Sequence, residues 1–289
     1  MFLGLRDAYS RAHMPVHFYL YSYYPKRDAE IAAPLNNVTV HAGHPVDIAL
    51  QLLPAILLRN FFSWALPQHW RKAADDLAGC DVVLLIGGTT FADSMWYKVP
   101  WNVLAALPAY LLKRPVLFLS QTIGPLHNAF NRLCAKWTFR RARHVHGRGK
   151  TSARYAAELD VCSASYWPDL SFSMDVPSWD SLVSSVPLLQ QCEDFITRLQ
   201  RRPVGICPNT IVLDKCRKKG IPYISFLRDI ITELFDRGYA PILIPHSYRP
   251  LTTGMHNNDR ALCKAVLEGL PKEIGIFYVD ADLNSRQLR

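Results

Sequence analysis

Residues 81–93 read DVVLLIGGTTFAD, a short apolar segment that ends in two glycines and several polar side chains. A continuous apolar run of this length, bounded by glycine, is typical of a strand buried on both faces of a parallel sheet. Glycines at the end of such a strand let backbone N–H groups approach a ligand. The stretch therefore predicts an α/β fold with ligand-binding groups at the carboxyl ends of its strands.

Similar short apolar segments, separated by helical patterns, occur on both sides of this stretch. Such alternation predicts a parallel sheet covered on both faces by helices, which is one doubly wound domain over residues 1–175. The predicted strands are 16–22, 38–41, 81–86, 116–120 and 144–147, and the predicted helices lie near 1–13, 67–78, 101–112, 128–141 and 151–159.

Residues 176–202 interrupt the alternation with prolines and one helical pattern near 188–199, and we predict a linker or hinge there. A second α/β unit is predicted over 203–289. Two such domains bind ligands at the carboxyl ends of their strands. The predicted strands of the second unit are 204–207, 240–245 and 276–279, and its predicted helices are 224–237 and 258–267.

Charge and cysteine content narrow the class of protein. The formal net charge is +9 and the pI is about 9.2, which favours anionic partners. The basic residues form no single tract and no nucleic-acid-binding motif is present, so we expect no nucleic-acid partner. The seven cysteines are scattered without CxxC or Cys/His ligand spacing. This distribution predicts neither a disulfide framework nor a metal site, and it favours a reduced, cytoplasmic location.

Two apolar stretches, 46–66 and 101–119, approach the length of a membrane span. Asp47 and Arg59 interrupt the first, and Lys113 with the next two residues interrupts the second. Neither offers the roughly 20 consecutive apolar residues that a spanning helix needs. We therefore expect packed helices and at most a peripheral association with membranes.

Residues 144–152, HVHGRGKTS, contain the letters GKTS of a nucleotide-binding P-loop. A P-loop needs a glycine five positions before the glycine of GKT, and His144 occupies that position. A strand that runs directly into a helix fits the segment better, with Thr151 or Ser152 capping the first turn. Because helix N-termini attract anions, and Arg148 lies beside this one, the segment predicts an anion site without a nucleotide.

Polar residues follow the predicted strands in both domains. Taken singly, each has an ordinary structural interpretation as a turn, a cap or a hydrogen-bonded loop residue. Together, at strand ends, they are candidates for substrate binding or catalysis. The candidates are Gly87, Gly88, Thr89, Asp93, Gln121, Arg148, Ser152, Asp169, Asn209 and His246.

Several short blocks follow one another in a distinctive order. They are GGTTFADS at 87–94, SQTIGP at 120–125, a strand ending in Arg148, WPD at 167–169, GICPN at 205–209, and IPH at 244–246 followed by Asn258-Asp259. In order and spacing, over nearly the whole chain, they resemble the polysaccharide pyruvyl transferase family. The resemblance implies two Rossmann-like domains in a GT-B-type arrangement. It also implies transfer of the enolpyruvyl unit of phosphoenolpyruvate to a sugar, as a pyruvate ketal on a cell-surface polysaccharide or its precursor.

On this resemblance, Arg148 and His246 are the expected catalytic residues. An arginine suits a donor that has both a carboxylate and a phosphate. Ketal formation needs an acid that protonates the methylene carbon and stabilisation of an oxocarbenium-like centre, and His246 is expected to bind the donor or assist proton transfer. The other candidates are expected to bind substrates, with Gly87, Gly88, Asp93 and Gln121 on the acceptor side. The acceptor is a saccharide, free or lipid-linked, and no cofactor or metal is expected beside the donor.

The sequence departs from the family's pattern at two points. Family members usually place an acidic residue after the arginine, whereas Gly149-Lys150 follows Arg148 here, which predicts a more cationic corner. Family chains also begin with a strand and a glycine-containing loop and extend to an Arg-x-His motif, and this sequence has neither feature. We therefore expect a truncated second domain. The chain is then expected to be a fragment, or the protein to have lost activity. Three hypotheses stay open: a pyruvyl transferase, a GT-B glycosyltransferase that uses a sugar nucleotide, and a non-catalytic glycan- or anion-binding remnant.

Overall fold

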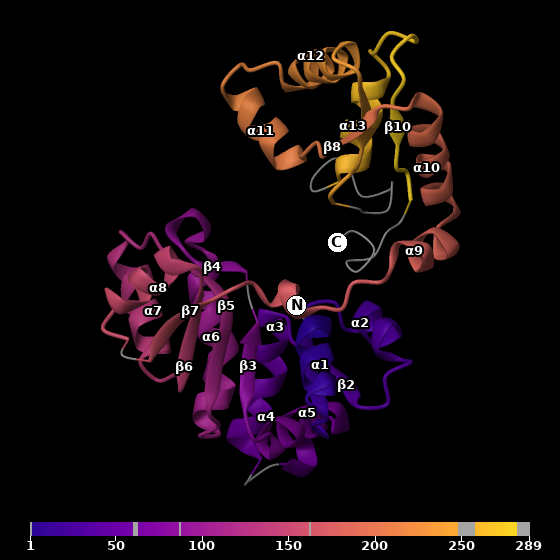
Figure 1. Cartoon of the computed structure of the whole chain (residues 1–289). Helices are drawn as coiled ribbons and strands as arrows, with labels where there is room; N and C mark the ends of the chain where they lie inside the picture. Colours follow the sequence, from indigo (N-terminus) through magenta and orange to yellow (C-terminus); the bar gives the residue numbers. More distant parts are fainter. Residues whose placement is uncertain (1, 60–62, 87, 162, 248–257, 282–289) are drawn as a thin grey trace. The chain divides into compact units, whose positions relative to one another are not determined.

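The computed structural model describes residues 2–59, 63–86, 88–161, 163–247 and 258–281. The chain forms two compact units, Met1–Met174 (unit 1) and Asp175–Arg289 (unit 2). Every strand pair in the described ranges is parallel, and helices separate most strands along the chain (Figure 1). The predicted α/β class with parallel sheets is therefore confirmed, while the division into two domains and a hinge at 176–202 stays a prediction.

Unit 1 contains two parallel sheets where one was expected. In the smaller sheet β1 (Phe18–Ser22) pairs with β2 (Val38–Ala42), and no pairing joins it to the larger sheet in the described part of the chain. The larger sheet has the order β3-β5-β6-β7, with β4 beside β5. Its strands are β3 (Val83–Ile86), β4 (Thr89–Phe91), β5 (Val116–Ile123), β6 (His144–Arg148) and β7 (Ala164–Trp167).

The larger sheet of unit 1 packs one face into the main hydrophobic core. Val116, Phe118 and Val145 point into this core, as expected from the alternation of side chains along a strand. On the opposite face, Leu117 and His144 are only half-buried. Helices were expected to cover both faces of the sheet, but they cover only one face of this larger sheet completely. The helices that cover the face in the main core are α6 (Lys98–Leu111), α7 (Ala129–Phe139) and α8 (Lys150–Ala157).

A second core of unit 1 lies beneath α5 (Gln68–Gly79), a helix that touches both sheets. Its Ala74 and Leu77 pack in a cluster with Tyr21 of β1 and Val83 of β3. The Tyr21 hydroxyl also donates a hydrogen bond to a backbone carbonyl of α5. The same cluster includes residues of η1 (Ile48–Leu52) and α4 (Leu53–Leu58). The other helices of unit 1 include α1 (Phe2–Arg11), α2 (Pro25–Ala32) and α3 (Pro45–Asp47), which leads directly into η1.

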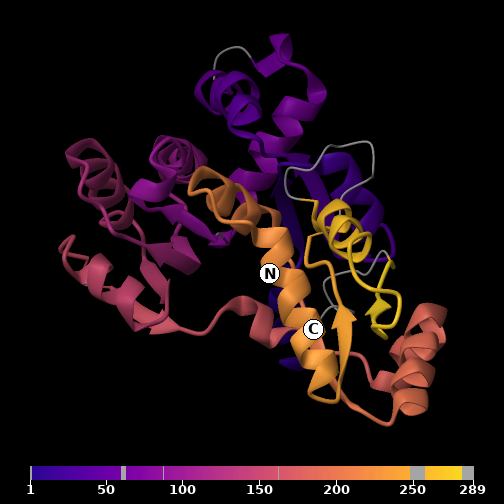
Figure 2. The same ribbon diagram turned by 90° about the horizontal axis from the view of Figure 1, so that it is seen from above.

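Unit 2 places helices on both faces of a three-stranded sheet of order β10-β9-β8. Successive residues of β9 face opposite sides, so Leu243 packs against α11, α12 and α13, whereas Ile242 packs against α9 and α10. Figure 2 shows helices on both sides of the strands of this unit. The strands are β8 (Arg202–Ile206), β9 (Tyr239–Leu243) and β10 (Phe277–Tyr278). The helices are α9 (Trp179–Ser185), α10 (Pro187–Leu199), α11 (Thr210–Lys218), α12 (Tyr223–Asp236) and α13 (Asp259–Leu267).

The two apolar stretches singled out in the sequence form short helices and a strand. The first contains η1 and α4, and the second contains most of α6 and the start of β5. Among the described residues, no helix combines the length and the apolar character that crossing a bilayer requires.

Candidate functional site

The carboxyl ends of β3, β5, β6 and β7 lie along one edge of the larger sheet, because these strands are parallel neighbours. Gly88 follows β3, and its carbonyl accepts a hydrogen bond from the Thr122 N–H of β5 at 3.1 Å. Arg148 ends β6 opposite Trp167 of β7. Several predicted candidates thus share this edge, while Gly87 lies outside the described residues.

Arg148 and Asp169 form an ion pair, with 2.7 Å between Nη1 of the arginine and Oδ2 of the aspartate. The Arg148 side chain keeps 38% of its surface exposed and Asp169 keeps 18%. Burial alone would raise the pKa of Asp169, but hydrogen bonds from Ser171 and Arg148 outweigh it and hold this pKa below its usual value. The carboxylate therefore stays charged and fixes one side of the guanidinium.

The segment after Arg148 turns from β6 directly into α8. The N-cap is Gly149, whose φ of 93° few other residues adopt, and no side chain caps the helix. The prediction that Thr151 or Ser152 caps the first turn is wrong, because both lie inside the helix. Ser152 is buried, and its hydroxyl accepts a hydrogen bond from the Ile123 N–H at 3.1 Å.

Among the described residues, no side chain accepts from the first N–H groups of α8, and two cations lie next to them. Lys150 lies at the first helical position, with its ammonium 5.9 Å from the centre of the Tyr166 ring. Arg148 precedes the cap. Free N–H groups, a helix dipole and fixed cations together make an electropositive corner. The corner can hold a small anion that has several acceptor oxygens.

Gln121 and its neighbour Ser120 are buried at the centre of this edge. The Gln121 amide donates to the carbonyls of Leu85 at 2.9 Å and of Leu119 at 3.0 Å. Ser120 has a positive φ of 57°, and its hydroxyl accepts from the Leu170 N–H at 2.7 Å. Both side chains thus hold backbone segments in place. A substrate contact by Gln121 stays a prediction. The role of Ser120 has no signal in the sequence beyond its position at the end of a predicted strand.

Asp93 and Thr89 lie near the same edge, in the segment that follows β3. The Asp93 carboxylate accepts hydrogen bonds from the backbone of His127 and Asn128 and from the Asn131 amide. Burial raises the pKa of Asp93, but these hydrogen bonds lower it more, so the net pKa is below its usual value. The arrangement favours a structural role for Asp93 at the start of α7. Thr89 pairs with β5, and the sugar-binding roles of both stay predictions.

The remaining candidates, Asn209 and His246, belong to unit 2. The Asn209 side chain caps α11 by accepting from the Ile211 N–H at 2.9 Å. His246 is exposed in the segment after β9. Sequence reasoning gave no role to Asp259, which is fully buried and accepts hydrogen bonds from Thr210 in the segment after β8 and from Ser247 in the segment after β9.

Among the described residues, no group of three or more His, Cys, Asp or Glu side chains could hold a metal ion. By position, the candidate residues fall into two sets, one in each unit. Arg148, Asp169 and the start of α8 form the charged set of unit 1. Asn209 and His246 belong to the polar segments of unit 2 that Asp259 joins.

Comparisons with known proteins place the chain in context. No curated protein matches it. Among solved structures, HepE of Anabaena, solved in complex with UDP, is similar with 15% identity and a TM-score of 0.46, covering 95% of this chain and 71% of that chain. The UDP-N-acetylglucosamine 2-epimerase of Rickettsia bellii has 11% identity and a TM-score of 0.39, covering 93% of this chain and 69% of that chain. Likeness at this level supports no functional inference.

The family comparison is more informative, because it spans nearly the whole chain. The family model described as polysaccharide pyruvyl transferase matches residues 16–288. This range includes every candidate residue of both units. The resemblance noted in the sequence is confirmed, and the chain belongs to the polysaccharide pyruvyl transferase family.

Proposed function

We propose that the protein transfers the pyruvyl group of phosphoenolpyruvate to two hydroxyls of a sugar, forming a pyruvate ketal on a cell-surface polysaccharide or its precursor. Family membership makes the protein a transferase that modifies polysaccharides. The observation that best supports the donor is the corner formed by Arg148, Lys150 and the uncapped start of α8. Phosphoenolpyruvate has a carboxylate and a phosphate, which are the groups that such a corner attracts.

The chemistry has a definite balance. A proton adds to the methylene carbon of phosphoenolpyruvate, which becomes a methyl group and leaves an oxocarbenium-like centre at the neighbouring carbon. One sugar hydroxyl attacks this carbon, and a second displaces the phosphate, so two C–O bonds form and one breaks. Of the two hydroxyl protons released, one replaces the proton added to the methyl group and the other leaves with the phosphate. The reaction needs no oxidant or metal, but it needs an acid and fixed positive charge.

Arg148 is suited to hold the donor. Its guanidinium has five N–H donors in a planar fork, and the ion pair with Asp169 occupies one side of it. The remaining donors and the first N–H groups of α8 are available for carboxylate and phosphate oxygens. The proposal further takes the two units as a GT-B-type pair, in which His246 would bind the donor or assist proton transfer. The cytoplasmic location and the acceptor-side roles of the other candidates stay predictions.

The test is an incubation of the protein with phosphoenolpyruvate and a galactoside acceptor, with phosphate release and the ketal methyl signal as readouts. Arg148→Ala should raise the half-saturating donor concentration about tenfold or more, since a charge-assisted hydrogen bond to a charged group is worth about 1.5–3 kcal/mol. Arg143→Ala is the matched control, because Arg143 directly precedes the strand that Arg148 ends, and it should leave the half-saturating donor concentration unchanged. Equal effects of the two substitutions would contradict the assigned role.

The same incubation separates the competing hypotheses. If a nucleoside diphosphate is released from a sugar nucleotide and no phosphate is released from phosphoenolpyruvate, the protein is a glycosyltransferase and the proposal fails. If phosphoenolpyruvate binds without turnover with any acceptor, the protein is a binding remnant. Calorimetric titration with phosphoenolpyruvate alone measures that binding.

A further inference from the structure

The rod formed by residues 45–58 is apolar on two sides. α3, η1 and α4 follow one another without a break, and the residues at the two junctions between them all have right-handed helical backbone angles. One side of the rod buries Ile48, Leu52 and Ile56 in the second core of unit 1. Its polar residues, Asp47 and Gln51, bond to each other at 3.0 Å. The core of unit 1 therefore accounts for only part of the apolar surface of this rod.

The other side of the rod is exposed to solvent. Val46, Leu50 and Leu57 lie at helical spacings of four and seven, which place them on one side. Leu50 is 64% exposed and Leu57 is 61% exposed, and Trp64, just beyond the rod, is 78% exposed. A helix that is apolar all round is normally buried or in contact with a membrane. We call Val46, Leu50 and Leu57 the apolar stripe.

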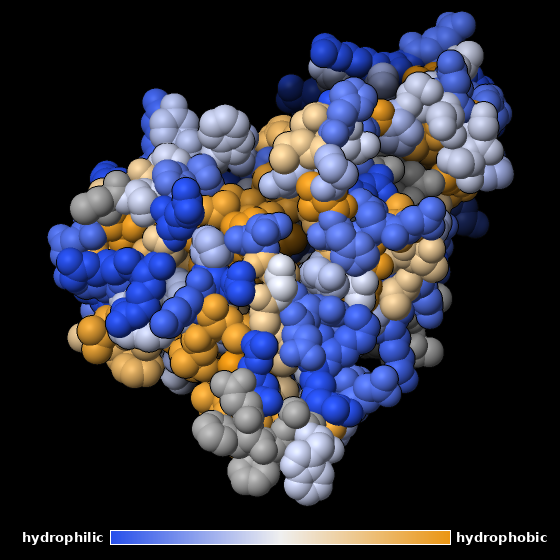
Figure 3. Space-filling view, turned by 90° about the horizontal axis from the view of Figure 1, so that it is seen from below, coloured by the Kyte–Doolittle hydropathy of each residue, from blue (hydrophilic) through white to orange (hydrophobic). Residues whose placement is uncertain are grey.

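Basic residues adjoin the end of this rod. Arg59 follows α4 directly and is exposed. Leu112, at the end of α6, packs in the cluster that also contains Ile56 of α4, and Lys113 follows Leu112 in the chain. Figure 3 views this end of unit 1 and shows apolar patches beside strongly hydrophilic ones.

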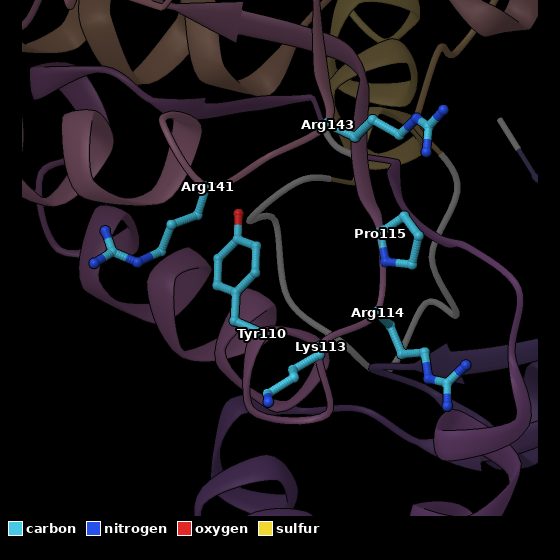
Figure 4. Close-up of a pocket in the computed structure, with 6 residues that line it drawn as sticks. All are labelled: Tyr110, Lys113, Arg114, Pro115, Arg141 and Arg143. Atoms are coloured by element: carbon cyan, nitrogen blue, oxygen red, sulfur yellow. The ribbon is translucent and has the colours of Figure 1, made fainter.

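Lys113 lies in a shallow cavity of about 480 Å³ at the amino ends of β5 and β6. Within the part of the chain that the structure describes, none of the cations around this cavity forms an ion pair with a carboxylate. Their side chains point in different directions and do not converge on one point (Figure 4). We call the cavity the basic cup. Its lining residues are Tyr110, Lys113, Arg114, Pro115, Arg141 and Arg143.

The combination of an apolar stripe and dispersed cations identifies the partner. Side chains that point apart suit a layer of negative charge better than one small anion, which needs convergent donors. A second copy of the chain, joined through the same surface, would bring the two basic cups close together, and like charges repel. We propose that unit 1 docks on a bilayer with anionic headgroups, with the apolar stripe entering the interface and the basic cup facing the headgroups. The proposal does not depend on the pyruvyl transfer reaction.

This mode of docking needs no spanning helix. Trp64 suits the boundary between headgroups and acyl chains, where an amphipathic ring is favourable. The long stems of Arg59 and Lys113 let their charges reach the headgroups while the rod lies in the interface. Each basic residue near an anionic surface strengthens binding, and salt screens the effect.

The test is co-sedimentation of the complete chain with vesicles of phosphatidylcholine, with and without phosphatidylglycerol. The protein should sediment with the anionic vesicles and stay in solution with the neutral ones. The double substitution Leu50→Gln with Leu57→Gln should weaken vesicle binding about tenfold or more, because apolar burial is lost. Lys113→Gln with Arg143→Gln should weaken it about tenfold at low salt and much less at high salt.

Matched controls lie elsewhere on the chain. Leu133 on α7 is 65% exposed, so Leu133→Gln removes the same kind of side chain away from the rod. Lys215→Gln with Arg217→Gln removes two charges from α11 of unit 2. Both controls should bind vesicles like the unaltered protein, and thermal melting should show that all variants are folded.

Three outcomes would overturn the proposal. The unaltered protein could fail to sediment with anionic vesicles, or it could bind neutral and anionic vesicles equally. The substitutions in the apolar stripe could leave vesicle binding unchanged. Light scattering tests the alternative partner, which is a second copy of the chain. If the protein is a dimer that Leu57→Gln dissociates, and it does not bind vesicles, the apolar stripe is a contact between copies of the chain.

Discussion

Replacing Asp259 by alanine removes the acceptor that joins the two polar segments of unit 2. Oδ1 of Asp259 accepts from the Thr210 N–H at 2.8 Å and from the Thr210 hydroxyl at 3.0 Å, and Oδ2 accepts from the Ser247 N–H at 2.9 Å. Asp259 is 0% exposed, so water does not reach this carboxylate. Its loss leaves two backbone N–H groups without their acceptor.

The expected cost follows from those two groups. A buried donor without a partner costs about 1–3 kcal/mol, so Asp259→Ala should lower the free energy of unfolding of unit 2 by about 2–6 kcal/mol. Asp259→Asn keeps the Oδ1 acceptor for Thr210 and turns an amide donor toward the Ser247 N–H. Since only that second contact is lost, we expect about 1–3 kcal/mol for the asparagine variant.

Urea unfolding followed by far-ultraviolet circular dichroism measures the free energy, and amide hydrogen exchange shows where it is lost. Exchange should become faster in residues 207–211 and 244–247, which include Asn209 and His246. The control is Asp214→Asn on the exposed side of α11, which should change stability by less than about 0.5 kcal/mol. An alanine variant as stable as the unaltered protein, with unchanged exchange in both segments, would refute the reasoning.

The remaining predictions concern an ion pair, two thiols and a close backbone contact. The pKa of Asp169 is lowered, so its pair with Arg148 should stabilise the protein at neutral pH and cease to do so as the pH falls below about 4. The difference in urea stability between the unaltered protein and Asp169→Asn should therefore shrink below that pH. Iodoacetamide should label Cys207 in the native protein much faster than Cys263. Burial raises the pKa of both thiols, that of Cys263 to about 12, but Cys207 is exposed whereas Cys263 is buried. Mass spectrometry identifies the labelled sites. Gly147→Ala should cost about 1–3 kcal/mol in urea unfolding, because its Cβ would lie 2.6 Å from the Ala153 nitrogen.

Each of these predictions has a clear contrary outcome. A stability difference for Asp169→Asn that persists unchanged in acid would show that the carboxylate contributes nothing through its charge. Equal labelling of both thiols in the native state would contradict the burial of Cys263. Gly79→Ala is the control for the glycine, because nothing lies within 4 Å of the added Cβ, and it should cost nothing.

Local signals were sufficient to predict most strands and helices of this chain. The predicted strand at 81–86 and helix at 67–78 differ from β3 and α5 by one or two residues, because apolar periodicity and flanking glycine or proline define both. α2 and α11 were missed, because α2 has few apolar residues and the apolar residues of α11 are mostly adjacent, at 211–213, instead of spaced at helical intervals. Their starts have local signals, a proline at the first turn of α2 and the Asn209 cap of α11.

Features that depend on contacts between residues far apart in the chain could not be predicted from the sequence. β5 continues past Ser120 to Ile123, because Thr122 and Ile123 pair with β4 and Gln121 pairs with β6. The ion pair of Arg148 with Asp169 likewise joins strand ends that only the sheet brings together. Ser152 was expected at the helix cap and is buried, because the cap position belongs to Gly149. A pattern specifies the type of an element, whereas pairing and burial depend on its neighbours.

The two sheets of unit 1 differ in how easily evolution can alter them. A backbone ladder tolerates many side chains, so the order of β3, β5, β6 and β7 can persist while their sequences diverge. The smaller sheet is held to α5 by particular side chains, including Tyr21 and His41, whose Nε2 lies 2.8 Å from Oδ2 of Asp76. A single substitution there can change how β1 and β2 are placed. We therefore expect homologous proteins to vary more in the placement of this small sheet than in the arrangement of the large one.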